Sequence, residues 1–190
     1  MTILGRLLKN RRSGESQAAW NRPNLHGPEL LDLSSRSFEH GATIPTEHNA
    51  KNAGGRNLSP HLAWNPPPAG TAQLLLVVED TDVPTPKPAV HCVVLIDPAV
   101  HDLPPGALTA RDPAPGVTVL RSFIGRGYKG PAPIKGHGPH HYAFQLFAFA
   151  TPLDTAPGRP APDEARPAKL LPSITATVLA RGRLIGTVER

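Results

Sequence analysis

Three predominantly apolar stretches constrain the fold of this chain more than any other feature of its sequence. Two of them, AQLLLVVED at residues 72–80 and AVHCVVLID at 89–97, are rich in Val, Ile and Leu, and a third, HYAFQLFAFA at 141–150, contains three of the five phenylalanines. Continuous apolar runs of this length, bounded by turn-forming residues, are typical of strands that are buried on both faces of a sheet. The sequence therefore predicts a mostly β protein with a sheet-centred core.

Breaker residues separate these apolar stretches. The chain has 24 prolines and 17 glycines among its 190 residues, and many of them lie in the connections at 65–70, 81–88 and 98–139. Such connections predict rigid loops around short strands, and the length suits one domain with a sizeable core. We therefore expect one β-rich domain at residues 30–190, preceded by an N-terminal helix and extension at residues 1–29.

Three further segments carry weaker secondary-structure signals. Residues 2–12 place apolar side chains at helical spacing and predict a short amphipathic helix, which we expect to dock on the protein body or in a homodimer. Residues 30–44 alternate imperfectly and predict edge strands with a turn at Gly41. Pro172 in a first turn and Gly182 as a stop signal predict a C-terminal helix that runs to about Arg181.

Charge and cysteine content limit the function classes. Lys and Arg exceed Asp and Glu, 20 against 15, but without an aromatic-studded basic stripe this excess predicts a solvated surface and no nucleic-acid partner. Cys92 is the only cysteine, which excludes an intrachain disulfide and suits a reducing compartment. Arg6 and Lys9 interrupt the apolar N-terminus, and no stretch has the length of a membrane span. We expect a cytoplasmic protein without an integral membrane segment.

Two acidic residues stand at the end of the first apolar stretch. Asp80 and Asp82 lie two positions apart, so in an extended chain both side chains point to the same side. This arrangement favours carboxylates that line a cleft at the strand end. It also suits a second interpretation, in which both acids cap a proline-containing turn, and the spacing alone does not decide between the two.

A histidine and the cysteine interrupt the second apolar stretch. His91 and Cys92 are adjacent, and because neighbouring strand residues face opposite sides, they cannot form a Cys–His catalytic pair. We therefore expect Cys92 to be inert core. A lone histidine in an apolar strand is usually a hydrogen-bonded core residue, and His91 becomes a functional candidate only if a second polar group meets it.

A glycine-rich loop, GRGYKGPAPIKGHGPHHY at residues 125–142, supplies such groups in His137, His140, His141 and Tyr142. Its glycines match the dinucleotide fingerprint by letter, but prolines follow where that motif needs a helix. We expect instead that the glycines bring backbone amides near a small anion such as phosphate, while imidazole N–H groups and the tyrosine hydroxyl complete the shell. Histidines near two aspartates leave a transition-metal site open as an alternative. No G-x-S-x-G motif marks a hydrolase nucleophile.

Three blocks in a fixed order resemble the signature blocks of the phosphatidylethanolamine-binding protein family, and in particular its bacterial, Raf-kinase-inhibitor-like branch. The blocks are GRNLSPHLAW, PPPAGTAQLLLVVEDTDVPTPKPAVHCVV and GYKGPAPIKGHGPHHYAFQLFA, and the similarity begins at about Leu30. The resemblance implies a PEBP-like fold with a large central antiparallel-rich sheet, a smaller sheet and short peripheral helices.

The resemblance also implies a pocket that binds phosphate-like anions, whose residues carry over onto Asp80, Asp82, His91, Pro131, His140 and Tyr142. In this interpretation His91 and His140 donate hydrogen bonds to ligand oxygens, Tyr142 adds a hydroxyl, and an aspartate fixes an imidazole tautomer. The expected function is a non-enzymatic module, without a cofactor, for a phosphate-bearing ligand or a phosphorylated group, with a kinase or protease as candidate protein partner. The alternative is a hydrolase or metal-dependent enzyme that uses the histidine cluster.

Overall fold

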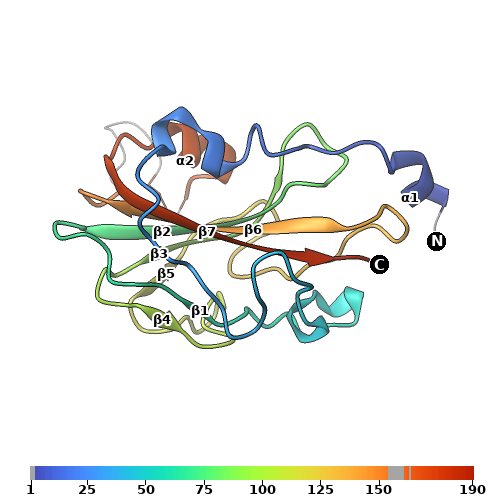
Figure 1. The fold of residues 1–190 in the computed structure, drawn as a ribbon, viewed down its shortest axis with the longest axis horizontal. Coiled ribbons are helices and arrows are strands. Elements are labelled where there is room, and N and C mark those ends of the chain that lie inside the picture. Colours follow the sequence, from blue (N-terminus) through green and yellow to red (C-terminus); the bar gives the residue numbers. More distant parts are fainter. Residues whose placement is uncertain (1–2, 154–160, 163) are drawn as a thin grey trace.

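A five-stranded antiparallel sheet forms the centre of the protein (Figure 1). The computed structural model describes residues 3–153, 161–162 and 164–190 of the chain. The strand order is β5-β3-β2-β6-β7, and a separate two-stranded sheet pairs β1 with β4. The strands are β1 (Leu62–Ala63), β2 (Gln73–Asp80), β3 (Ala89–Ile96), β4 (Asp102–Leu103), β5 (Val117–Val119), β6 (His140–Phe149) and β7 (Val178–Val188). The mostly β fold predicted from the sequence is therefore confirmed.

The helical elements are short and lie around the sheet. Two are α-helices and four are single 3₁₀ turns among the described residues. They are α1 (Ile3–Leu8), η1 (Ala19–Asn21), η2 (Pro23–Leu25), η3 (Thr46–His48), η4 (Lys51–Ala53) and α2 (Pro167–Ser173).

The three apolar stretches of the sequence became β2, β3 and β6, which are the three interior strands of the sheet. Their side chains alternate between two cores, because successive strand residues face opposite sides. Leu74 and Leu76 belong to one core, and Leu75 and Val77 belong to the other. Burial on both faces explains why these strands are continuously apolar.

Different elements cover the two faces. Trp20 from η1, Leu25 from η2 and Leu170 from α2 pack into one core, whereas Leu62 of β1 and Leu103 of β4 pack into the other. Figure 1 shows the same arrangement, with α2 on one side of the sheet and the small β1–β4 sheet on the other. The N-terminal extension is thus packed against the sheet.

A buried polar network also holds this extension in place. The Oε2 atom of Glu79 accepts hydrogen bonds from the backbone N–H of Ala19 (2.7 Å) and from Nε2 of Gln145 (2.8 Å). Gln145 Oε1 accepts from the backbone N–H of Trp20 at 2.7 Å. Glu79 is 2% exposed, and burial raises its pKa above the ordinary value.

The N-terminal helix is shorter than predicted. It spans Ile3–Leu8 where residues 2–12 were expected, and residue 2 lies outside the described residues. Leu7 is 75% exposed, so its side chain does not dock on the protein body, and docking in a homodimer stays a prediction. Gly5 instead approaches the backbone of Lys135 and Gly136, where a Cβ atom would collide.

The edge strands predicted at residues 30–44 are wrong. This segment makes only isolated bridges, Ser34 with Ala63 and Thr43 with Thr187. Serine side chains can bind backbone groups that a regular β ladder would otherwise use. Here Ser35 Oγ accepts a hydrogen bond from the backbone N–H of Ser37 at 2.9 Å. The turn at Gly41 is confirmed, since this residue has a φ of 80°.

The helix predicted from Pro172 to Arg181 is also wrong. Pro172 lies inside α2, and the chain from Val178 onward is the edge strand β7. Gly182 is not a helix stop, because the backbone of Leu31 crosses β7 there and occupies the position of a Cβ atom. The alternating burial of β7 is the strand signal that the sequence interpretation missed.

Candidate functional site

The residues predicted for the ligand site lie together at one end of the central sheet. The β2–β6 register places Asp80 directly opposite Tyr142. The five polar candidates are buried, with exposed fractions of 1–7%. Two lie at or after the end of β2, one on β3, one in the buried loop before β6, and two at the start of β6: Asp80, Asp82, His91, Pro131, His140 and Tyr142.

His140 is the centre of a buried chain of hydrogen bonds. Its Nδ1 lies 2.7 Å from Asp80 Oδ2, and its Nε2 lies 2.7 Å from Nδ1 of His137. The Nε2 atom of His137 lies 2.8 Å from the carbonyl oxygen of Leu8 and 3.1 Å from that of Arg11. The chain therefore joins a carboxylate at the end of β2 to the backbone of the N-terminal segment.

One donor of this chain is identified by its partners. A carbonyl oxygen only accepts, so Nε2 of His137 is the donor towards Leu8 and Arg11. In the neutral tautomer of His137, Nδ1 then accepts from Nε2 of His140.

Asp82 binds a different histidine. Its Oδ2 accepts from the backbone N–H of His141 (2.7 Å) and lies 2.8 Å from the Nδ1 of that ring, while Arg12 forms an ion pair with Oδ1. Burial alone would raise the pKa of Asp82, but the hydrogen bonds from His141 and Arg12 outweigh burial and lower it. The two acids thus bind neighbouring histidines. Asp80 binds the buried His140, and Asp82 binds His141, whose side chain is half-exposed.

The turn-capping interpretation is confirmed for one of the acids. Asp80 Oδ1 accepts the backbone N–H of Asp82 at 2.9 Å. Asp80 therefore uses one oxygen to shape the turn after β2 and the other to hold His140.

His91 approaches the same place from β3. Its ring packs edge-on against Tyr142, with centroids 5.3 Å apart and an interplanar angle of 87°. Its Nδ1 donates to the carbonyl oxygen of Lys129 at 2.7 Å, so in the neutral ring Nε2 carries the lone pair. Burial lowers the pKa of His91, and this favours the neutral form.

Tyr142 lies between these groups and has an incomplete set of contacts. Its hydroxyl is buried and makes no hydrogen bond of good geometry among the residues that the structure describes, although the Asp80 carboxyl and the Ala132 backbone lie close enough to it to affect its pKa. Burial raises the pKa of Tyr142, and the negative charge of the neighbouring Asp80 raises it further. Buried hydroxyls are normally hydrogen-bonded, so this atom marks a place where a ligand oxygen can bind. We call Asp80, His91, His140 and Tyr142 the Tyr142 cluster.

The loop that contains Pro131 is anchored by hydrogen bonds to residues 50 and 57. The Pro131 carbonyl accepts the amide of Ala50 at 2.9 Å, and the amide of Gly130 donates to Asn57 Oδ1 at 2.9 Å. We expected glycine amides of this loop to be offered to an anion. For Gly130 this prediction is wrong, because its amide is already bound within the protein. Gly130 is a glycine because the backbone at His48 and Asn49 approaches it closely.

Metal and thiol chemistry find little support in the geometry. Across residues 3–153, 161–162 and 164–190, no group of three or more His, Cys, Asp or Glu side chains is arranged to hold a metal ion. Both ring nitrogens of His137 and of His140 are engaged in hydrogen bonds. Burial raises the pKa of the Cys92 thiol to about 12, so Cys92 is inert core as predicted.

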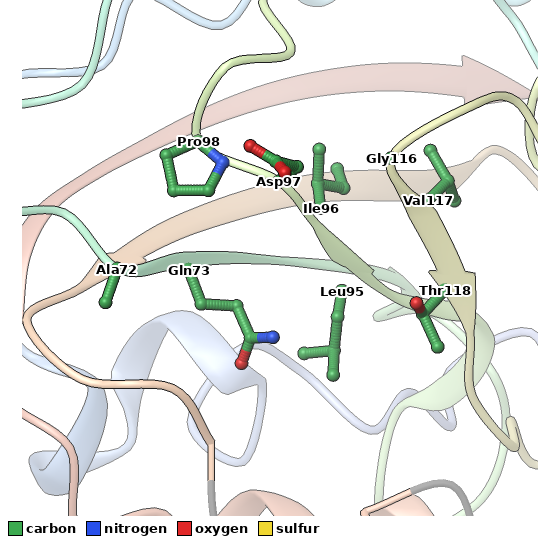
Figure 2. Close-up of a pocket in the computed structure, with 9 residues that line it drawn as sticks. All are labelled: Ala72, Gln73, Leu95, Ile96, Asp97, Pro98, Gly116, Val117 and Thr118. Atoms are coloured by element: carbon green, nitrogen blue, oxygen red, sulfur yellow. The ribbon is translucent and has the colours of Figure 1, made fainter.

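A surface hollow of about 330 Å³ lies away from this cluster (Figure 2). It is lined by the first residues of β2, the last residues of β3 and the start of β5, and it includes none of the six candidates. Its polar side chains have other partners: Gln73 Oε1 accepts the amide of Leu153 and Asp97 Oδ1 accepts the amide of Ala99, each at 2.8 Å. No buried polar atom of these residues is left for a ligand, so the hollow is a weaker candidate than the Tyr142 cluster.

The sequence interpretation missed Arg12 as a partner of this site. Arg12 and Asp82 are separated by 70 positions, and nothing in the basic N-terminus indicated which arginine would reach the acid. His137 was expected to contribute to an anion shell, but the structure places it behind His140, as the next member of the hydrogen-bonded chain.

Comparison with known proteins agrees with the fold. The model of the family described as phosphatidylethanolamine-binding protein matches residues 34–189. A putative lipoprotein, LppC, of Mycobacterium tuberculosis is 35% identical over 164 residues, which cover 85% of this chain and 73% of the relative. A UPF0098 protein of Aquifex aeolicus is 30% identical over 172 residues, covering 86% and 91%.

The crystal structure of YbcL from Escherichia coli, described as a new member of the mammalian PEBP family, superimposes with a TM-score of 0.70 at 26% identity. The match covers 85% of this chain and 99% of YbcL. The fold and the family match together define a ligand-binding module of a known class. This chain belongs to the phosphatidylethanolamine-binding protein family. Every helix within the described residues is too short or too polar to span a bilayer.

Proposed function

We propose that this chain is a non-enzymatic module that binds a phosphate-bearing ligand, or a phosphorylated group, at the Tyr142 cluster. The observation that carries the proposal is the Tyr142 hydroxyl, which is buried without a hydrogen-bond partner among the described residues. Leaving a buried hydroxyl unpaired costs about 1–3 kcal/mol. A ligand oxygen that accepts from this hydroxyl recovers that energy.

Two of the groups around the hydroxyl bear on anion binding. An isolated carboxylate at Asp80 would repel an anion, but both of its oxygens are engaged within the protein, by His140 and by the amide of Asp82. His91 contributes a second contact through Nε2, the ring nitrogen that does not bind Lys129. Hydrogen bonds from a charged imidazole to a phosphate oxygen are about twice as strong as neutral ones.

The arrangement supports binding and not catalysis. Asp80, His140 and His137 follow the order of an acid–base relay, but the last imidazole donates to the carbonyl oxygens of Leu8 and Arg11. A relay activates a nucleophile only if it ends on a hydroxyl or thiol. The family match to phosphatidylethanolamine-binding proteins supports the same assignment.

The proposal predicts that anion affinity falls as pH rises. In the free protein, burial lowers the pKa of His91, and the neutral ring has a lone pair on Nε2. That nitrogen must gain a proton before it donates to an anion, so the complex contains one proton more than its separated parts. Proton uptake of this kind weakens binding by up to about tenfold for each unit of pH increase.

NMR titration at pH 5.5 and at pH 7.5 tests this function. Inorganic phosphate is the first probe, and sulfate is the second, because its charge does not change between these two pH values. We expect shifts centred on His91, His140 and Tyr142 and at least about tenfold tighter sulfate binding at the lower pH. His91→Asn should remove the pH dependence, whereas the control His101→Asn, at an exposed position, should keep it. Absence of binding, or shifts elsewhere, would overturn the proposal.

Two wider parts of the proposal rest on composition and family. We propose a cytoplasmic location, which is supported by a single, buried cysteine, and which cell fractionation tests. We also propose that site occupancy alters contact with a protein partner, with kinases and proteases as the first classes to assay. Sedimentation of the purified chain tests the proposed homodimer.

A further inference from the structure

The N-terminal segment Leu8–Gly14, called the strap below, lies directly beside the candidate site. Arg12 pairs with Asp82, and its Nη1 also donates to the carbonyl oxygen of Pro139 at 2.9 Å. The amides of Ser13 and Gly14 donate to the carbonyl oxygens of Val83 and Thr81, each at 2.9 Å. The strap therefore contacts both the turn after β2 and the loop before β6.

The strap also supplies oxygen acceptors to the histidine chain of the site. The carbonyl oxygens of Leu8 and Arg11 both face Nε2 of His137, at 2.8 and 3.1 Å. His137 in turn binds His140, which is a member of the Tyr142 cluster. Two backbone oxygens of the strap thus hold the far end of the hydrogen-bonded chain that positions His140.

Polar contacts, and little apolar burial, hold the strap in place. Residues 9–12 and 14 are exposed, and Leu8 and Ser13 are half-buried. Segments with few buried apolar contacts open at low free energy, whereas the strands of the central sheet open only with the whole fold. The Tyr142 cluster is buried, so an element beside it has to move before an anion reaches the hydroxyl. The strap contacts the site residues and is held at the surface by polar contacts.

We infer that the docked strap covers the anion site, so that strap docking and ligand binding compete. This inference rests on the proposed function, because it assigns the regulation of the same site. Release of the strap leaves Nε2 of His137 without its carbonyl partners and removes Arg12 from Asp82. A ligand that binds only the open form has its apparent affinity reduced by the fraction of molecules that are open.

A charge-neutral variant separates strap opening from changes in electrostatics. Gly14 has a φ of 69° and its amide donates to Thr81. Proline has a φ near −65° and lacks this donor, so Gly14→Pro should release the strap while Arg12 and Asp82 remain. The matched control is Ser16→Pro, which places proline at the second position of the turn closed by the Ala18 amide and the Glu15 carbonyl, where proline is favoured.

Two measurements report on each variant. Hydrogen exchange of the Ser13 amide reports strap opening, and calorimetric titration with inorganic phosphate reports the site. We expect Gly14→Pro to speed Ser13 exchange and to tighten phosphate binding by about fivefold or more, whereas Ser16→Pro should change neither. Gly14→Ala keeps the amide but strains the backbone, so it should shift both readouts in the same direction by less, and it serves if the proline variant does not fold.

The outcomes distinguish this inference from the proposed function. If phosphate binds the unaltered protein and faster Ser13 exchange in Gly14→Pro brings equal or weaker phosphate binding, the strap inference fails and the proposed function stands. If neither the unaltered protein nor the open variant binds phosphate, the proposed function fails and the regulation fails with it. Competition also requires saturating phosphate to speed Ser13 exchange in the unaltered protein, because coupling is reciprocal. Slower exchange would overturn the inference.

Discussion

Two neighbouring acids on β2, Glu79 and Asp80, belong to two buried polar networks that differ in one respect. In the Glu79 network, the carboxylate and the Gln145 amide bind the backbone of Ala19 and Trp20. In the Asp80 network, the carboxylate holds an imidazole chain but the nearby Tyr142 hydroxyl has no partner among the described residues. A network whose polar groups meet each other holds the fold together, whereas one with a free buried hydroxyl is prepared for a ligand.

The largest effect should come from breaking the Glu79 network. Glu79→Ala leaves the Ala19 amide and the Gln145 side chain without their shared acceptor, and each unpaired buried group costs about 1–3 kcal/mol. We therefore expect the free energy of unfolding in urea to fall by about 3 kcal/mol. Phosphate affinity of the folded variant should stay unchanged. A change in phosphate affinity with unchanged stability would reverse the roles given to the two networks.

The pH dependence of stability should differ in sign between Glu79 and Asp82. Burial raises the folded-state pKa of Glu79 above 4.5. The contribution of Glu79 to the free energy of unfolding is therefore fully present below about pH 4.5 and is lost as pH rises through the folded-state pKa. The folded-state pKa of Asp82 is lowered from 3.8. The contribution of Asp82 to the free energy of unfolding is therefore present above pH 3.8 and is lost as pH falls through the folded-state pKa.

Urea unfolding at several pH values measures both slopes. Glu79→Gln should remove the loss of stability towards neutral pH, and Asp82→Asn should remove the loss towards acid. Each effect should be on the order of 1 kcal/mol, because Arg12, the ion-pair partner of Asp82, is exposed to solvent and Glu79 keeps its hydrogen bonds when protonated. Parallel pH profiles for the two variants would contradict the pKa directions assigned to these acids.

The sequence predicted the interior strands, and it predicted that Asp80 and Asp82 stand at a strand end, because both depend on local patterns. Continuous apolar runs fixed β2, β3 and β6, and the spacing of Asp80 and Asp82 placed polar groups at a strand end. The contacts of Arg12 and of the Leu8 and Arg11 carbonyls join positions more than 65 residues apart, so no local pattern indicated them. Gly182 misled the prediction of a C-terminal helix, since a glycine under a crossing chain and a glycine that ends a helix look the same in the sequence.

Tyr142→Phe tests the central claim most directly, with Tyr128→Phe as the matched control. The Tyr128 hydroxyl donates to the His48 carbonyl at 3.2 Å, so Tyr128→Phe should cost about 1 kcal/mol of unfolding free energy and leave phosphate binding unchanged. Tyr142→Phe removes a buried hydroxyl without a partner in the described structure, and we expect equal or higher stability together with about tenfold weaker phosphate binding. Lower stability with unchanged phosphate affinity would show that Tyr142 is a structural residue and would contradict the account.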